Sequence, residues 1–125
     1  ANGMEVNMET PGSIDHDGSL LDYCRLHDIT LQAWSPFQMP AWKGCFLGSD
    51  EYPELNQKLH VLAEKYNVSD TTIAAAWLLR HPANMQIITG TASESRLKEI
   101  IAACEITLTR EEWYELYLAA GHPLP

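Results

Sequence analysis

The sequence predicts too little β-strand for the number of helices around it, and this imbalance constrains the fold more than any other feature. Residues 29–34 and 86–89 are the two convincing strands, whereas five segments have helical patterns. Strands that alternate with helices pair in parallel, because a parallel connection needs a helical crossover. Two parallel strands with exposed edges do not make a stable domain. We therefore expect part of an α/β barrel, a fold that takes about 250 residues when complete.

Capping residues and apolar periodicity mark the five helices. The capping signals are, in chain order, Ser19 with Asp22, Pro53, Ser69, and Thr109 with Glu112. The helix expected over residues 71–80 is apolar almost all round, so it should lie between neighbours. The apolar stripes of the other helices are expected to face inward: Leu20, Leu21, Cys24 and His27; Leu55, Leu59, Leu62, Ala63 and Tyr66; Leu97, Ile100, Ile101 and Cys104; Trp113, Leu116, Tyr117 and Ala120.

The remaining segments are predicted to be loops. Residues 1–18 are rich in Gly, Asn, Asp and Pro and are expected to form a loop or arm, which leaves residues 19–125 for the part-barrel. Ala1 fits either removal of an initiator Met or a chain that starts within a longer protein. Residues 37–52 form a connection of a length typical of lids and binding loops.

Charge and cysteine content exclude several classes of function. Lys and Arg number 8 against 17 Asp and Glu, and a net charge of −9 argues against nucleic acid as a partner. The apolar runs are too short to span a membrane, and the N-terminus lacks a signal-peptide pattern. The three cysteines have no metal or redox spacing and the five histidines are scattered, so no metal site is predicted. Free thiols indicate a cytoplasmic protein.

The first candidate binding segment follows the first predicted strand. Trp34, Ser35, Pro36 and Phe37 combine an aromatic ring with a hydroxyl, a rigid turn and an apolar side chain. Ligands gather at the carboxyl ends of parallel strands, because loops converge there. Trp34 could stack on a flat heterocycle while Ser35 and the following N–H groups hold phosphate oxygens. Spacing alone favours a plainer interpretation, a buried aromatic anchor beside an ordinary proline turn.

The second candidate segment follows the second predicted strand, where Gly90 leads through hydroxyl residues into a helix with Arg96 in its first turn. A cation there opposes the helix dipole unless an anion such as a phosphate shares the site. A solvated ion pair between Arg96 and Glu99 explains the same placement. Taken together, two turns suited to phosphate suggest an extended nucleotide lying across a barrel mouth.

These segments resemble the aldo/keto reductase family in order and spacing over residues 19–120. Residues 20–25 and 29–37 resemble the region around the family's seventh strand, and residues 62–66 and 73–80 resemble the helices that follow it. Residues 87–91 and 96–99 resemble its eighth strand and cofactor helix, and residues 108–113 resemble its closing helix. The resemblance implies an α/β fold that is the C-terminal portion of a (β/α)8 TIM barrel, with two parallel strands and about five helices.

The resemblance further implies an NADPH-dependent oxidoreductase that reduces aldehydes or ketones to alcohols. The resemblance implies that Trp34 stacks on the nicotinamide and that Ser35, Pro36 and Phe37 lie along the pyrophosphate. It implies that Gly90, Thr91, Ala92 and Arg96 lie at the 2′-phosphate and that Glu99 faces the adenine amine. Three positions depart from the family pattern. Gln38, Gly90 and Ile100 stand where members have glycine, lysine and asparagine, which leaves Arg96 as the main phosphate cation.

The resemblance places the family's catalytic tyrosine, lysine, aspartate and histidine in its N-terminal half, and none of the five tyrosines here matches. We therefore expect a fragment that has no catalytic residue and does not catalyse the reaction by itself. A small-molecule carbonyl substrate is expected to bind only to the complete protein. The alternative is a non-catalytic nucleotide-binding or partner-docking module. Strand residues such as Leu31, Ala33, Ile87 and Ile88 are expected to face an incomplete barrel interior, which favours self-association or pairing with the missing N-terminal half.

Overall fold

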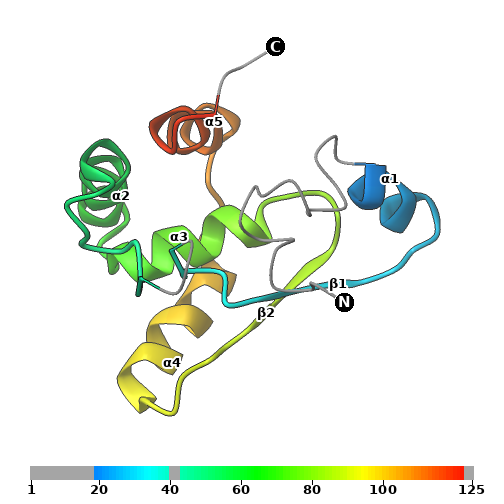
Figure 1. The fold of residues 1–125 in the computed structure, drawn as a ribbon, viewed down its shortest axis with the longest axis horizontal. Helices are drawn as coiled ribbons and strands as arrows, with labels where there is room; N and C mark the ends of the chain where they lie inside the picture. The colour runs from blue at the N-terminus through cyan, green and yellow to red at the C-terminus, as the bar shows by residue number, and fades with distance from the viewer. Residues whose placement is uncertain (1–18, 40–42, 123–125) are drawn as a thin grey trace.

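The computed structural model describes residues 19–39 and 43–122, so the predicted arm over residues 1–18 lies outside the described residues. Helices and strands alternate along the chain (Figure 1). The elements are α1 (Ser19–Leu26), β1 (Leu31–Trp34), α2 (Pro53–Tyr66), α3 (Asp70–Leu79), β2 (Met85–Ile88), α4 (Glu94–Ala102), the short 3-10 helix η3 (Ala103–Glu105) and α5 (Arg110–Ala119). The α/β prediction is confirmed, with each predicted element found within a few residues of its expected bounds.

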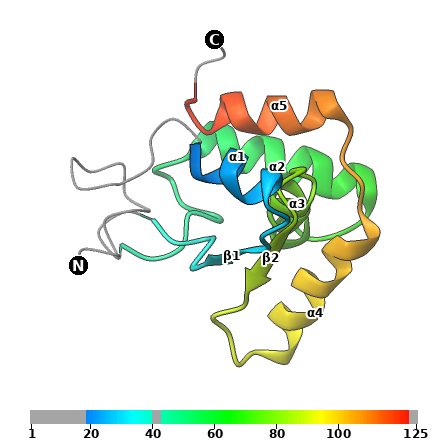
Figure 2. The same ribbon diagram turned by 90° about the vertical axis from the view of Figure 1, so that its right-hand side faces the viewer.

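The two strands pair in parallel, as the alternation of elements predicts. Leu31 lies opposite Met85 and Trp34 lies opposite Ile88, and the described residues contain no third strand in this sheet. The connection between the strands passes through α2 and α3, and α3 packs against β2. In Figures 1 and 2, α3 lies between α2 and α5 on one side and α4 with the strands on the other.

The prediction for the strand faces is wrong in part. Leu31, Ala33 and Ile87 are half-buried, and Ile87 packs on the hydrophobic core around α3. The opposite face is exposed and carries Trp34 and Ile88, whose exposed fractions are 43% and 41%. Successive side chains of a strand point to opposite faces, so Ile87 and Ile88 cannot both face a barrel interior.

Helix α3 is the centre of the hydrophobic core, which confirms the expectation that it lies between neighbours. Its residues 72–76 are buried. The core residues that surround them come from α2, α4, η3, α5 and the segment before α5: Leu59, Leu62, Ala63, Ile100, Ala103, Leu108 and Leu116. At the far end of α3, Trp77 and Trp113 stack at 4.7 Å between ring centroids. Each of these indoles donates a hydrogen bond of 3.0 Å to the other residue's carbonyl oxygen.

Two of the predicted inward-facing stripes are covered less than expected. On α1, Cys24 is buried, but Leu20 is exposed, as is His27 just after the helix. On α4, Ile100 is buried, whereas Leu97 and Ile101 are exposed, as is Cys104 in η3. Periodicity identifies the apolar side of a helix but does not say whether a neighbour lies against it.

The predicted capping residues hold two helix starts. The Ser69 side chain accepts a hydrogen bond from the Thr72 N–H at 3.2 Å. Thr109 and Glu112 form the reciprocal capping box of α5. Within the ranges described, no helix has the length and apolar character needed to cross a membrane, and no group of His, Cys, Asp or Glu side chains could hold a metal ion.

Candidate functional site

The two candidate binding segments leave the same end of the sheet. Trp34 ends β1 and Ile88 ends β2, and these two residues are paired across the sheet. Because the strands are parallel, residues 35–38 and 89–93 both begin at its carboxyl edge. The structure therefore brings the starting points of the two predicted segments together, at the edge where α/β folds bind ligands.

The turn after β1 has an unusual backbone. Ser35 has φ of 48°, in the left-handed region that residues other than glycine seldom adopt. Its carbonyl oxygen accepts a hydrogen bond of 3.1 Å from the Gln38 N–H, which closes the turn. Trp34 lies on the exposed sheet face, whereas Phe37 packs against the hydrophobic core. The two rings that flank the turn, Trp34 and Phe37, therefore lie in different surroundings, one on the exposed sheet face and one on the core.

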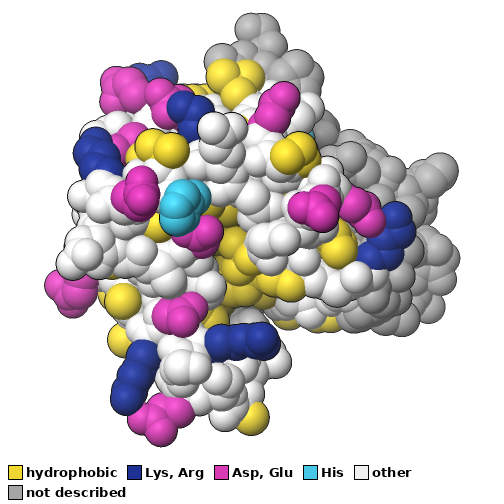
Figure 3. Space-filling model, turned by 90° about the vertical axis from the view of Figure 1, so that its left-hand side faces the viewer, with side chains coloured by type: hydrophobic (Ala, Val, Ile, Leu, Met, Phe, Trp, Pro, Cys, Tyr) yellow, Lys and Arg dark blue, Asp and Glu magenta, His cyan; other side chains and the backbone are white. Residues whose placement is uncertain are grey.

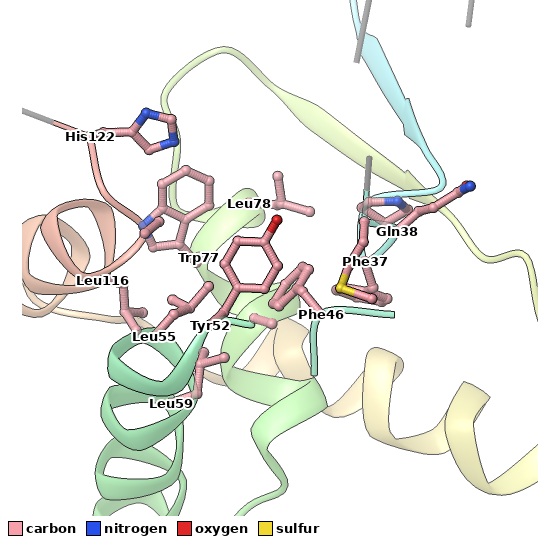
Figure 4. A pocket seen from close by; sticks show the side chains of 14 residues that line it. Phe37, Gln38, Phe46, Tyr52, Leu55, Leu59, Trp77, Leu78, Leu116 and His122 are labelled. Carbon is pink, nitrogen blue, oxygen red and sulfur yellow. The ribbon is translucent and has the colours of Figure 1, made fainter. Parts of the chain in front are cut away.

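An apolar cavity of about 340 Å³ lies behind this turn. Figure 4 shows Phe46, Tyr52 and Trp77 around the same space, with Leu55 and Leu59 of α2 below them. Its lining residues come from the turn, the loop after it, α2, α3, α5 and the segment after α5: Pro36, Phe37, Gln38, Met39, Phe46, Tyr52, Leu55, Leu59, Ala74, Trp77, Leu78, Leu116, Ala120 and His122. Trp34 is not among them, so this cavity and the exposed sheet face are separate surfaces.

Backbone hydrogen bonds join the described parts of the long connection after the turn, residues 37–39 and 43–52. The Phe46 N–H donates to the Phe37 carbonyl oxygen at 3.0 Å, and the Met39 N–H donates to the Gly44 carbonyl oxygen at 2.8 Å. Asn56 joins this connection to α2: its amide donates to the carbonyl oxygen of Phe46 at 2.9 Å and accepts from a loop N–H. Sequence reasoning missed Asn56. A polar residue at the start of a helix that follows a long loop is a usable signal, because its amide can bind loop backbone groups.

The segment after β2 leads to the start of α4, where the side chain of the N-cap residue does not accept a hydrogen bond from the first turn of the helix. Ser93 is the N-cap residue of α4, but its hydroxyl makes no capping hydrogen bond and lies instead 2.9 Å from the Ser95 hydroxyl oxygen. Thr91 accepts the Ser93 N–H at 3.1 Å. A side chain at Gly90 would meet no atom within 4 Å. The N–H groups of the first turn of α4 and the space beside Gly90 are thus available to an anion.

Arg96 and Glu99 lie on α4 but do not form the predicted alternative ion pair. In the parts of the chain that the structure describes, Arg96 makes no ion pair, and it is exposed in the first turn of α4. The ion pair on this helix joins Lys98 to Glu94 at 2.7 Å. The Thr72 hydroxyl donates a hydrogen bond of 2.8 Å to the Glu99 carbonyl oxygen, which attaches α4 to α3. The helix is therefore fixed in its second half, while Arg96 is free to meet a ligand.

Among the described tyrosines, Tyr52 lines the cavity behind the turn after β1, and the Tyr23 ring lies 4.3 Å from the His27 ring between centroids. Tyr66 donates to the Glu112 carboxylate at 2.7 Å, and Tyr114 and Tyr117 pack on the ring of Trp113. On the face drawn in Figure 3, basic and acidic side chains are interspersed and no continuous basic surface is visible, in keeping with the net charge of −9. The two turns that begin at the carboxyl edge of the sheet are therefore the candidate binding site.

Comparison with known proteins adds a family to this geometry. The sequence model of the aldo/keto reductase family matches residues 2–117. The chain is 33% identical over 100 residues to 6-dehydroglucose reductase of Agrobacterium fabrum, an alignment covering 80% of this chain and 32% of the relative. It is 31% identical over 109 residues to 6-dehydroglucose reductase of Novosphingobium aromaticivorans, covering 84% of this chain and 34% of the relative.

A solved structure gives a similar result. The fold matches the crystal structure of the thermostable aldo-keto reductase Tm1743, solved in complex with the inhibitor epalrestat. The TM-score is 0.64 at 29% sequence identity, and the match covers 82% of this chain and 34% of that chain. The chain thus spans about a third of the length of these relatives.

Proposed function

The chain belongs to the aldo/keto reductase family, a family of oxidoreductases, and on this premise we propose that it is the nucleotide-binding, C-terminal part of an NADPH-dependent carbonyl reductase. The observation that carries the proposal is that two turns, residues 35–38 and 89–93, both begin at the carboxyl edge of a parallel sheet. Complete, such an enzyme reduces an aldehyde or ketone to an alcohol.

The residues at this edge fit the parts of a dinucleotide phosphate. Trp34 offers a partly exposed ring to the nicotinamide, and the backbone N–H groups of Ser35 and Phe37 would donate to the pyrophosphate, because Pro36 between them has none. Thr91, Ala92 and Arg96 surround the open start of α4 and would hold the 2′-phosphate, for which Gly90 leaves room. The Glu99 carboxylate would accept a hydrogen bond from the adenine amino group. When bound, NADPH supplies the hydride that reduces the carbonyl carbon.

This chain binds and orients but does not move the proton that carbonyl reduction also needs. A general acid must lie within hydrogen-bond reach of the carbonyl oxygen. Tyr66 is engaged by Glu112, and Tyr114 and Tyr117 take part in helix packing. Tyr52 lines the apolar cavity behind the turn, against Phe46, and not the exposed sheet face that carries Trp34. The catalytic tetrad is therefore proposed to come from the rest of a complete barrel.

Nucleotide binding without turnover is the first expected result. Titration of the chain with NADPH in a calorimeter should give saturable binding, and NADH should bind at least about tenfold more weakly because it lacks the 2′-phosphate. With an aldehyde added, the absorbance of NADPH should stay constant. Absence of NADPH binding would contradict the proposed site, and oxidation of NADPH by the chain would contradict the proposed origin of the catalytic residues.

The exposed sheet face supports a second proposal, that this face pairs with the missing part of the barrel or with a second copy. Trp34 and Ile88 expose apolar surface there, beside strand edges that are unpaired among the described residues. Sedimentation velocity should show association that increases with concentration and is reduced by Ile88→Glu. The control Val61→Glu, on the exposed side of α2, should leave it unchanged. A monomer at every concentration would contradict association of copies.

A further inference from the structure

The turn after β1 needs support from outside itself. Ser35 is held at φ of 48°, and a residue other than glycine keeps such a conformation only where its surroundings enforce it. Pro36 and Phe37 border the cavity of about 340 Å³, so side-chain packing behind the turn is incomplete. Hydrogen bonds must supply what packing does not.

A chain of hydrogen bonds runs from this turn to the middle of the following loop. The Gln38 N–H donates to Ser35, and the Phe37 carbonyl oxygen accepts the Phe46 N–H at 3.0 Å. Gln38 and Cys45 form an antiparallel bridge between the two arms of the loop. The position of the turn therefore depends on the position of Phe46.

Asn56 fixes Phe46 and the residues after it. Its amide nitrogen lies 2.9 Å from the carbonyl oxygen of Phe46, 3.1 Å from that of Ser49 and 3.0 Å from that of Tyr52. Its amide oxygen accepts the Gly48 N–H at 2.8 Å. One half-buried side chain thus attaches both ends of residues 46–52 to α2, a helix that the hydrophobic core holds in place.

We propose that Asn56 is a positioning residue for the nucleotide-binding turn: it fixes residues 46–52 on α2, and through Phe46 and Phe37 it keeps Ser35 in the conformation that faces the ligand. Asn56 itself touches no ligand. The inference rests on the proposed function for the identity of the ligand, but the coupling between Asn56 and the turn does not depend on it.

The variant Asn56→Asp tests this coupling in the full chain. Aspartate keeps the size of the side chain and the acceptor for the Gly48 N–H, but its carboxylate cannot donate to the loop carbonyl oxygens. Asn67→Asp is the matched control, because Asn67 ends the same helix at φ of 54°, a conformation that aspartate tolerates. Amide hydrogen exchange of Met39 and Phe46, read by NMR, should speed up about tenfold in Asn56→Asp and remain unchanged in the control.

The exchange of amides within α3 separates positioning from general stability. Unchanged exchange at Ile73, together with faster exchange at Phe46, supports positioning. Equal acceleration at both amides would show that Asn56 stabilises the whole chain, and unchanged exchange at Phe46 would show that it does not hold the loop; either result overturns the inference.

Nucleotide affinity is the second readout. The dissociation constant for NADPH should rise about fivefold to tenfold in Asn56→Asp and stay the same in Asn67→Asp, as expected for the loss of about one net hydrogen bond. An unchanged dissociation constant in Asn56→Asp would overturn the role in nucleotide binding. Failure of the unmodified chain to bind NADPH would contradict the proposed function, while the exchange rates at Phe46 would still decide whether Asn56 positions the turn.

Discussion

Replacing Glu112 with alanine is expected to lower the free energy of unfolding by about 2 to 3 kcal/mol. The Glu112 side chain accepts hydrogen bonds from the Thr109 N–H at 2.7 Å, the Lys65 ammonium at 2.6 Å and the Tyr66 hydroxyl at 2.7 Å. Alanine removes the capping box of α5 and the bonds that join α5 to α2. The loss stays below that of a fully buried ion pair, because Lys65 is exposed enough to be hydrated.

Chemical denaturation of Glu112→Ala and of Glu115→Ala measures this contribution. Glu115 lies on the same helix and pairs with Lys58 at 3.0 Å, but both side chains are exposed, so its replacement should change stability little. An equally small change in Glu112→Ala would contradict the assigned role of the network in holding α5.

The same network makes stability depend on acid. Burial raises the pKa of Glu112, but the hydrogen bonds from Lys65, the Thr109 backbone and Tyr66 outweigh it, so the pKa lies below its usual value of 4.5. The unfolded chain then takes up this proton at a higher pH than the folded chain. The contribution of ionised Glu112 to the free energy of unfolding is fully present above pH 4.5 and is lost as pH falls through the pKa of Glu112 in the folded chain. The stability of Glu112→Ala should therefore lack this part of the dependence on pH.

Replacing Arg96 with alanine is expected to weaken NADPH binding by about tenfold to a hundredfold, the range of a charge-assisted hydrogen bond to phosphate. Arg96 is exposed in the first turn of α4, beside the open helix start, and makes no ion pair within the described part of the chain. NADH lacks the 2′-phosphate, so its affinity should change little. Calorimetric titration with both nucleotides measures the difference, which should shrink at high salt because salt screens exposed charges.

Lys98→Ala is the matched control for Arg96→Ala. It removes one positive charge from the same helix, but Lys98 already pairs with Glu94 at 2.7 Å. We expect a smaller effect on NADPH affinity than that of Arg96→Ala. Equal effects would indicate a general influence of charge, and an unchanged affinity in Arg96→Ala would show that the phosphate lies elsewhere.

The parts of the fold that sequence could predict are those that depend on neighbours along the chain. Ser69 and Thr109 cap the helices as expected because a capping bond joins residues three apart. The apolar run of α3 predicted burial because no side of that helix could face water. For the candidate site, the order of strand, turn and helix was enough to place both turns at one sheet edge.

What sequence could not predict depends on contacts between distant residues. Leu20, His27 and Ile101 lie on stripes with helical spacing, but their side chains are exposed. The bonds of Asn56 to the loop depend on how the chain returns to α2 after residues 37–52, and no period in the sequence encodes that path.

The sequence by itself determined the order of elements, the parallel pairing and the family resemblance, because these follow from local propensity and from strand-helix alternation. The tertiary structure alone decided which strand face is exposed, that Arg96 is not paired with Glu99, and that Asn56 binds the carbonyl oxygen of Phe46 in the loop after the turn. These outcomes depend on which surfaces find a partner when the chain packs, and packing is decided by segments far apart in the sequence.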